Sequence, residues 1–151
     1  MKVRDVMQEG VDPIAADATV TEAALRMAEL DRGAVVVGTK DALAGILTDR
    51  DIILRVVAVG RNPAEVSVGE VMSSTLFACR EDDTLEHAFH EMRERQVRRL
   101  PVMDGAGKPI GIVTLRELSR VSREPELVEQ ALRDLAEPHA DRGRASDKAA
   151  G

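Results

Sequence analysis

The stretch Gly45-Ile46-Leu47-Thr48-Asp49-Arg50-Asp51 decides the fold, because the chain repeats it in nearly the same form. The second copy is Gly111-Ile112-Val113-Thr114-Leu115-Arg116-Glu117, which begins 66 positions later. Upstream residues repeat at a spacing of 65, as in Val6-Met7 and Val71-Met72, so one residue has been added in a single loop. Two tandem copies of a unit of about 55 residues predict a fold that is completed by packing the copies together.

The length and composition indicate what kind of core these copies can form. A chain of 151 residues buries about 68–70% of its unfolded surface, whereas half of it would be marginally stable alone. We therefore expect one compact domain made of both repeats. Only Phe77 and Phe89 are aromatic, although 44% of the residues are apolar. The core should be aliphatic, and a planar ligand should contact aliphatic side chains or backbone.

Charge and cysteine content narrow the class of partner and the compartment. The formal net charge of −6 disfavours general binding to nucleic acid, whose phosphates repel an acidic protein. The single cysteine, Cys79, fits a reducing compartment. The first residues lack the apolar run of a signal peptide, and no segment approaches the roughly 18 apolar residues of a membrane span. We expect a soluble, cytoplasmic protein with no nucleic-acid and no membrane partner.

The patterning of each copy predicts the order β-α-β-β-α. In the first copy an extended stretch at 12–15 precedes a helix that Thr19 and Glu22 begin as a capping box. This helix should end near Arg32, before Gly33, and the remaining predicted elements are two strands at 34–37 and 44–47 and a helix at 49–59. The second copy repeats the order at residues 75–78, 85–95, 100–103, 110–113 and 115–122.

This order predicts a mixed α/β (α+β) fold and a division of the chain. The first repeat should cover residues 1–60 and the second 61–122, with a turn-rich linker at about 61–67. Residues 123–138 predict a short amphipathic helix. The polar stretch 139–151 has no apolar periodicity and should be disordered.

Thr48 and Asp51 have two interpretations that can both hold. Thr-x-x-Asp after a strand is itself a capping box, and such short motifs often occur by chance. The start of a helix also offers free N–H groups to a phosphate. A Thr hydroxyl there can donate to a phosphate oxygen, and a carboxylate one turn later can accept from the hydroxyls of a ribose.

The duplicated set as a whole resembles the CBS domain, named after cystathionine β-synthase. The resemblance rests on Val-Met, on Thr-Val-x-Glu-Ala-Ala at 19–24, on the repeated Gly-Ile-Leu-Thr-Asp-Arg-Asp segment and on Arg98-Arg99-Leu100-Pro101-Val102. It extends over about residues 2–120. Closest in layout are stand-alone bacterial CBS-pair proteins, including the hypoxic-response type. The resemblance implies two repeats packed with pseudo-two-fold symmetry as a Bateman module, with ligand clefts between them.

In this family the clefts bind adenosine-containing ligands such as AMP, ADP, ATP, S-adenosylmethionine or NAD. The resemblance then implies that Asp51 holds the ribose and Thr48 a phosphate. Ile46 and Leu47 would form part of the cleft wall, and the extended stretch near Ile14 would face the base. No other cofactor is implied.

The second copy departs from the pattern at Glu117, which replaces the expected Asp. The extra methylene moves the carboxylate by about 1 Å or more, whereas recognition needs placement within about 0.5 Å. Thr114 is retained, so we expect one good site and one weaker or empty one. Arg98 and Arg99 match family positions whose basic residues reach ligand phosphates. The alternative is that they belong to the mixed-charge surface that begins at Glu91.

The remaining candidates do not indicate catalysis or a metal site. His87 and His90 are three apart on a helix, but no further ligand at suitable spacing completes a metal set. Cys79 has no activating neighbour in sequence and should be a small core residue. We therefore expect no enzyme activity and no bound metal.

The sequence thus predicts a non-catalytic regulatory module that senses an adenosine nucleotide. Ligand binding would favour one arrangement of the repeats, which an unidentified protein partner would detect. CBS pairs usually form homodimers, and the resemblance implies the same here. The alternative function is a ligand-independent oligomerisation or scaffold module that acts through a protein partner.

Overall fold

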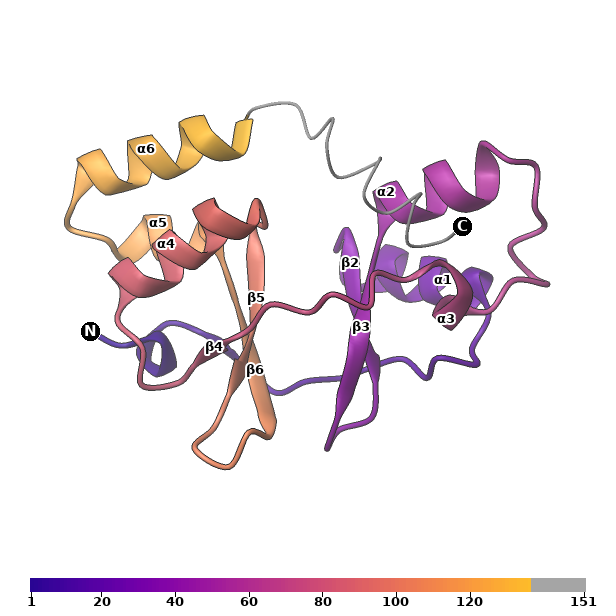
Figure 1. The fold of residues 1–151 in the computed structure, drawn as a ribbon, viewed down its shortest axis with the longest axis horizontal. Helices are drawn as coiled ribbons and strands as arrows, with labels where there is room; N and C mark the ends of the chain where they lie inside the picture. Colours follow the sequence, from indigo (N-terminus) through magenta and orange to yellow (C-terminus); the bar gives the residue numbers. More distant parts are fainter. Residues whose placement is uncertain (137–151) are drawn as a thin grey trace. The chain divides into compact units, whose positions relative to one another are not determined.

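The computed structural model describes residues 1–136, and residues 137–151, with the predicted disordered tail, lie outside that part of the chain. The described chain forms two compact units, labelled by element in Figure 1. We call them unit 1, which contains Met1–Val11 and Phe77–Ala136 among the described residues, and unit 2, which is Asp12–Leu76.

Unit 2 contains a two-stranded antiparallel sheet with helices packed against it. Its elements are α1 (Val20–Leu30), β2 (Ala34–Gly38), β3 (Leu43–Thr48), α2 (Asp49–Ile52), η2 (Ile53–Val57) and α3 (Val68–Val71). The strands pair in a register that places Ala34 opposite Thr48 and Val36 opposite Ile46. The four buried residues 34–37 explain why the sequence shows an unbroken apolar run here.

The first helix of unit 2 begins where the sequence predicts and ends two residues early. The Thr19 hydroxyl accepts a hydrogen bond from the Glu22 N–H at 3.2 Å, and the Glu22 carboxylate accepts from the Thr19 N–H at 3.3 Å. The helix ends at Leu30 because Asp31 adopts the left-handed conformation, with φ of 51°. The predicted end near Arg32 was wrong because the C-cap is an aspartate, which tolerates this conformation, and not Gly33.

The helix predicted at 49–59 is present in two parts. One α-helical turn, α2, continues directly into a π-helical segment, η2, which ends at Val57. Only Val56 is buried in η2, while Ile53, Leu54 and Val57 are exposed. Gly60 has φ of 74° and follows the helical segment, as predicted for a residue just beyond a helix.

Unit 1 contains a four-stranded sheet in the order β1-β6-β5-β4. Its elements are η1 (Val3–Asp5), β1 (Gln8–Glu9), β4 (Cys79–Arg80), α4 (Leu85–Arg95), β5 (Arg99–Met103), β6 (Pro109–Thr114), α5 (Leu115–Val121) and α6 (Pro125–Ala136). Strand β4 is parallel to β5, and the other pairs are antiparallel. The helix predicted at 85–95 is confirmed residue for residue.

The strand predicted at 75–78 was wrong. Residues 74–78 form no strand, and the pairing begins at Cys79, which lies opposite Val102. The apolar run that indicated a strand contains Phe77, which packs against the core from outside the sheet. A strand is defined by its backbone partners, so a run of suitable side chains without a partner strand stays irregular.

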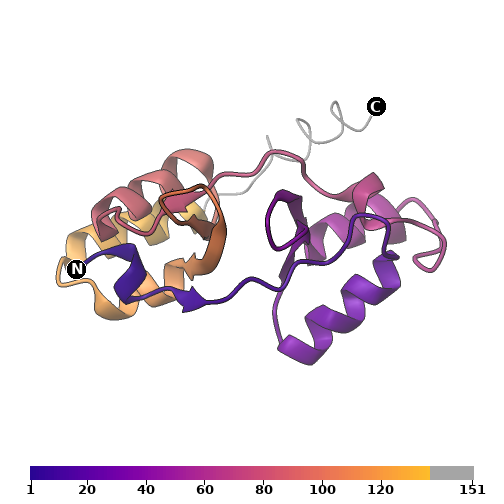
Figure 2. The same cartoon turned by 90° about the horizontal axis from the view of Figure 1, so that it is seen from below.

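Each unit takes a short segment from the other repeat. In unit 1, β1 precedes the first repeat's helix but pairs with β6, with Gln8 opposite Ile112. The indigo segment in Figures 1 and 2 is the N-terminal part of the chain that contains β1. In unit 2, Ile46 pairs with Ser73, which precedes the second repeat's helix. The compact units therefore do not coincide with the repeats read from the sequence at 1–60 and 61–122.

The two cores are aliphatic, as predicted. The core of unit 2 is made of Ile, Val, Leu, Ala and Met side chains, and that of unit 1 adds the fully buried Phe89. Helix α6 lies along α4 in Figure 1 and contributes Ala131 and Leu135, which are 0% and 1% exposed, to the core of unit 1. The amphipathic helix predicted after residue 123 thus packs on its own chain.

The described part of the chain contains no helix with the length and apolar character needed to cross a bilayer.

Candidate functional site

The end of β3 presents two of the predicted site residues on one face. Side chains alternate along a strand, and here Gly45 and Leu47 are buried while Ile46 and Thr48 are partly exposed. Ile46 and Thr48 therefore share the face that is accessible to a ligand. Leu47, with 0% exposure, belongs to the core beneath that face.

Thr48 and Asp51 form two reciprocal hydrogen bonds at the junction of β3 and α2. The Thr48 hydroxyl oxygen accepts from the Asp51 N–H at 3.1 Å, and Asp51 Oδ2 accepts from the Thr48 N–H at 3.0 Å. The capping interpretation is therefore confirmed. The pair nevertheless keeps capacity for a ligand, because the Thr48 O–H proton and the Asp51 Oδ1 atom have no hydrogen-bond partner among residues 1–136.

Ile14 lies beside β2 and not on an exposed surface. Its N–H donates to the Val36 carbonyl at 2.9 Å, and its carbonyl accepts from the Gly38 N–H at 2.9 Å. The residue is 4% exposed and packs in the core of unit 2. Its side chain thus supports the sheet next to β3.

In unit 1, Thr114 and Glu117 form the same cap at the start of α5. Glu117 Oε2 accepts from the Thr114 N–H at 2.8 Å, and the Thr114 hydroxyl accepts from the Glu117 N–H at 3.4 Å. The other carboxylate oxygen, Glu117 Oε1, accepts from the Gln8 side-chain amide at 2.5 Å. Both oxygens of Glu117 are therefore engaged, whereas Asp51 has one oxygen left.

Gln8 is one of the residues that sequence reasoning missed. It precedes the first repeat, yet it satisfies the carboxylate of the second. Its counterpart at a spacing of 65 is Ser73, which occupies the matching place against β3. A serine side chain is too short to reach Asp51 as Gln8 reaches Glu117. The spacing of 65 residues that relates Met7 to Met72 also relates Gln8 to Ser73. This spacing was the signal in the sequence that could have identified Gln8.

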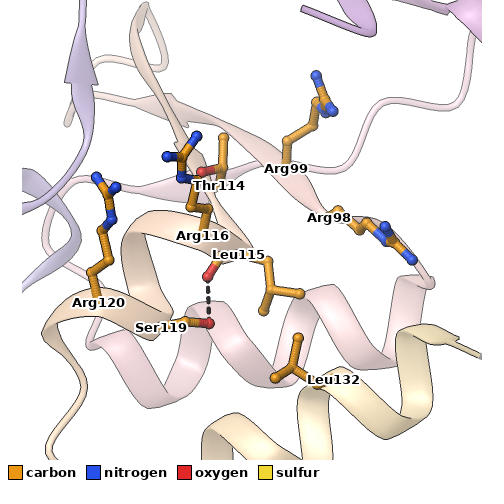
Figure 3. A pocket seen from close by; sticks show the side chains of 8 residues that line it. All are labelled: Arg98, Arg99, Thr114, Leu115, Arg116, Ser119, Arg120 and Leu132. Carbon is orange, nitrogen blue, oxygen red and sulfur yellow. Dashed lines mark hydrogen bonds between the residues drawn. The ribbon is translucent and has the colours of Figure 1, made fainter.

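Arg98, Arg99 and Thr114 lie together in a pocket of unit 1 with a volume of about 520 Å³. Figure 3 shows this pocket between the start of β5, helix α5 and helix α6. Its lining residues are Arg98, Arg99, Thr114, Leu115, Arg116, Ser119, Arg120 and Leu132. Glu117 is not among them. Arg116, Ser119, Arg120 and Leu132 were not predicted as site residues.

The neighbouring charges separate Arg98 from the mixed-charge surface on α4. Arg93 pairs with Asp134 at 2.6 Å and Arg95 with Glu91 at 3.4 Å, so these arginines have acidic partners. Arg98 instead donates from Nη2 to the backbone carbonyl of Leu135 at 3.1 Å. It therefore fastens the end of α6 while it lines the pocket.

Unit 2 has no such arginine pair at the matching place. The Asp49 N–H donates to the Gly33 carbonyl at 2.9 Å, as the Leu115 N–H donates to the Arg98 carbonyl at 2.8 Å. Gly33 thus occupies the position of Arg98. A Cβ atom on Gly33 would lie 3.0 Å from Asp49 Oδ2, the end of an exposed side chain that can move.

The remaining sequence candidates have structural roles. Burial, with a contribution from the charge of Asp83, raises the pKa of the Cys79 thiol to about 12, and the residue is 3% exposed. The prediction of a core cysteine is confirmed. His87 lies 3.8 Å from an Asp83 oxygen. Residues 1–136 contain no cluster of three or more His, Cys, Asp or Glu side chains arranged to hold a metal.

Comparison with known proteins agrees with the duplicated architecture. The family model described as "CBS domain" matches residues 3–58 and again 68–124. Hypoxic response protein 1 of Mycobacterium tuberculosis is 34% identical over 138 residues, which cover 91% of this chain and 95% of that protein. An uncharacterized protein of Methanopyrus kandleri is 41% identical over 111 residues, 73% of this chain. The match spans 56% of that protein's length.

Solved structures give the same result. The crystal structure of Hypoxic Response Protein I with two coordinated zinc ions matches with a TM-score of 0.73 and 34% identity, over 81% of this chain and 99% of that one. CBSX2 in complex with AMP matches with a TM-score of 0.66 and 26% identity, over 79% of this chain and 93% of that one. CBSX2 comes from Arabidopsis thaliana. This chain therefore belongs to the CBS-domain family and contains the domain twice.

Proposed function

We propose that this CBS-pair protein is a regulatory module that binds an adenine nucleotide and catalyses no reaction itself. The observation that carries the proposal is the bonded pair of Thr48 and Asp51, which keeps a hydroxyl proton and a carboxylate oxygen available at the accessible end of β3. The relative CBSX2 was solved with AMP, which supports adenine nucleotides as the ligand class. AMP, ADP and ATP are the first candidates, followed by S-adenosylmethionine and NAD.

Each predicted site residue has a chemical role in this proposal. Asp51 Oδ1 accepts from a ribose hydroxyl, as carboxylates do in other nucleotide sites, and the Thr48 hydroxyl donates to a phosphate oxygen. Ile46 supplies apolar surface next to the base. Ile14 and Leu47 hold that face in place from the core beneath it.

The second repeat offers a different set of groups. Arg98 and Arg99 bind phosphate oxygens, because guanidinium groups match their geometry and charge. Thr114 remains as a hydroxyl donor. Glu117 is a poor ribose acceptor because Gln8 and the Thr114 N–H already occupy its two oxygens. The motif of the second repeat is therefore the weaker of the two ribose sites.

The output is a shift between conformations. A ligand that binds one conformation more tightly increases the population of that conformation, and a protein partner binds the favoured state. Exposed apolar side chains on η2 support self-association as a homodimer, since Ile53, Leu54 and Val57 are 57%, 44% and 63% exposed.

Isothermal titration with each candidate nucleotide tests the site. In Asp51→Ala the affinity should fall by about 10- to 150-fold, the effect of losing a hydrogen bond to a charged group. Asp49→Ala is the matched control, because it removes a carboxylate from the same helical turn but leaves the Thr48–Asp51 pair intact. Circular dichroism should show that both variants fold. A nucleotide affinity that is the same in Asp51→Ala and wild type would refute the assignment.

A further inference from the structure

The segment that crosses to β3 in unit 2, residues 71–73, is attached to the strand over a short length. We call it the crossing segment. Ser73 and Ile46 form an isolated pair, in which the Ile46 N–H donates to the Ser73 carbonyl at 3.0 Å and the Ser73 N–H donates to the Ile46 carbonyl at 2.9 Å. In unit 1 the corresponding segment forms the two-residue strand β1, and the N–H of the next residue, Gly10, donates to a carbonyl of β6 at 2.9 Å. The crossing segment of unit 2 therefore depends more on contacts from side chains.

Arg55 in η2 supplies such a contact. Its Nη1 atom donates to the Val71 carbonyl at 2.7 Å and to the Met72 carbonyl at 3.4 Å. Val71 ends α3 and Met72 is the C-cap, so both carbonyls belong to a helix end, where intrahelical donors run out and a basic side chain can take their place. The two bonds are partly buried, and a charged hydrogen bond is stronger there than in water.

Arg55 belongs to the same helical stretch as the Thr48–Asp51 pair. Helix α2 continues without a break into η2, which contains Arg55, and the stretch directly follows β3, which contains Ile46. The crossing segment is therefore bonded to β3 through Ile46 and to the next element of the chain through Arg55. These two attachments fix the segment against the strand that presents Ile46 and Thr48 to a ligand.

Unit 1 fastens its corresponding segment with a different side chain. Val121 stands 66 residues after Arg55, and a valine side chain has no donor. Gln8 instead connects β1 to α5 by donating to Glu117 Oε1 at 2.5 Å. This bond uses an oxygen of the motif carboxylate, whereas Arg55 bonds to backbone carbonyls and takes up no oxygen of Asp51. The attachment in unit 2 thus leaves the motif carboxylate available.

We propose that Arg55 is a positioning residue of the first repeat's site, which holds the crossing segment against β3 and keeps Ile46 and Thr48 in the arrangement that binds a ligand. This role rests on the proposed function, because it concerns the same site. Loss of a hydrogen bond from a charged group shifts the equilibrium between the held and the released segment by about 10- to 150-fold. The apparent affinity for a ligand falls with the fraction of molecules in the held state.

Amide hydrogen exchange without ligand tests the attachment. Arg55→Met removes the donors but keeps a long side chain, so the amides of Ile46 and Ser73 should exchange faster by about tenfold or more, because the segment opens more often. Arg55→Lys restores a donor and should recover part of the protection. Arg26→Met is the matched control, since it removes a hydrogen bond from Arg26 to the Asp12 carbonyl at 3.2 Å in the same unit and should leave both amides as in wild type. The amides of β2 are the internal reference.

Calorimetric titration of the same variants with AMP tests the connection to the site. The affinity should fall by about two- to tenfold in Arg55→Met, as the held fraction decreases. Arg55→Lys should recover part of that loss, and Arg26→Met should bind as wild type does. AMP should also slow the exchange of the Ser73 amide in wild type, because the ligand and the held segment favour the same state. A purely structural role for Arg55 would leave that exchange rate independent of AMP.

The remaining outcomes separate this role from the proposed function. Exchange at Ile46 and Ser73 that is equal in Arg55→Met and wild type refutes the role of Arg55. Equal acceleration of the β2 amides refutes a local attachment, and faster exchange with unchanged AMP affinity refutes the positioning of the site. If no adenine nucleotide binds to wild type, the proposed function fails, whereas the exchange rates still decide whether Arg55 holds the crossing segment.

Discussion

The carbonyl oxygen of Gln8 lies so close to Gly111 that a Cβ atom on Gly111 would be 2.5 Å from it. The same relationship holds in unit 2, where a Cβ on Gly45 would lie 2.3 Å from the Ser73 carbonyl. Real Cβ atoms do not approach backbone oxygens this closely, so both positions exclude a side chain. The glycine that opens each repeated motif is thus explained by the crossing of a segment from the other repeat.

Replacement of Gly111 by alanine should destabilise unit 1, because the added methyl group must displace the backbone at Gln8. We expect a cost of about 1–3 kcal/mol, as for other overpacked sites, measured as a lower midpoint in chemical denaturation. Gly105→Ala is the control, since no atom lies within 4 Å of a Cβ there. Equal midpoints for the two variants would show that the backbone moves aside without cost.

This crossing also marks the limit of what the sequence could predict. The repeat with its helix and strand periodicity predicted the long helix and the antiparallel strand pair of both copies, and α4 was placed without error, but β1 and α3 were not predicted. The periodicity contains no information on which repeat a short segment pairs with. The pairing of β1 with β6, and of Ser73 with Ile46, depends on backbone hydrogen bonds that leave no pattern in the side chains.

The candidate site could be predicted to a similar extent. The spacing of Thr48 and Asp51 was enough to predict their cap, because a capping box is a local interaction. Gln8, 109 residues from Glu117 in the chain, could not be found by local reasoning. No local pattern relates Arg120 to Arg99, and only the fold brings the two residues into one pocket.

The cap at the start of α2 should make a measurable contribution to stability. Thr48→Ala removes the hydroxyl that accepts from the Asp51 N–H, and the loss should be about 0.5–2 kcal/mol. Thr48→Ser keeps the acceptor and should stay closer to wild type. Urea denaturation followed by far-UV circular dichroism measures both. Equal losses in the two variants would mean that the Thr48 methyl group, and not its hydroxyl, stabilises the helix.

Helix α6 should be an integral part of unit 1. Leu135 is 1% exposed and lies in the core, whereas Leu132, one turn earlier, is 51% exposed. Leu135→Ala should cost about 2–5 kcal/mol, the usual range for a buried leucine. The same change at Leu132 should cost much less, because it leaves no cavity in the core. Comparable denaturation midpoints for the two variants would contradict the packing of α6.

The thiol of Cys79 should be unreactive in the folded protein. Its pKa is raised by burial, and further by the charge of Asp83, from 9.0 to about 12, and only the thiolate attacks alkylating reagents. Iodoacetamide at pH 8 should therefore label the urea-unfolded chain much faster than the native one. Native labelling at the unfolded rate would show that Cys79 is accessible.

The same shift predicts a loss of stability in alkaline solution. A folded-state pKa above the unfolded value favours the protonated thiol in the folded protein. The contribution is complete below the unfolded pKa near 9 and decreases as the pH rises toward about 12. Denaturation midpoints measured across this window should fall more in wild type than in Cys79→Ala. Midpoints that fall equally with pH in wild type and in Cys79→Ala would contradict the raised pKa of Cys79.

The most direct test of the central claim, that this chain binds an adenine nucleotide, is a thermal melt with AMP, ADP, ATP, S-adenosylmethionine or NAD. Far-UV circular dichroism is the suitable signal, because the chain contains no Trp or Tyr. A ligand at 100 times its dissociation constant adds about 2.7 kcal/mol, so the melting temperature should rise by roughly 5–11 °C. At least one of these ligands should produce that rise. An unchanged melting temperature with all five would contradict the account.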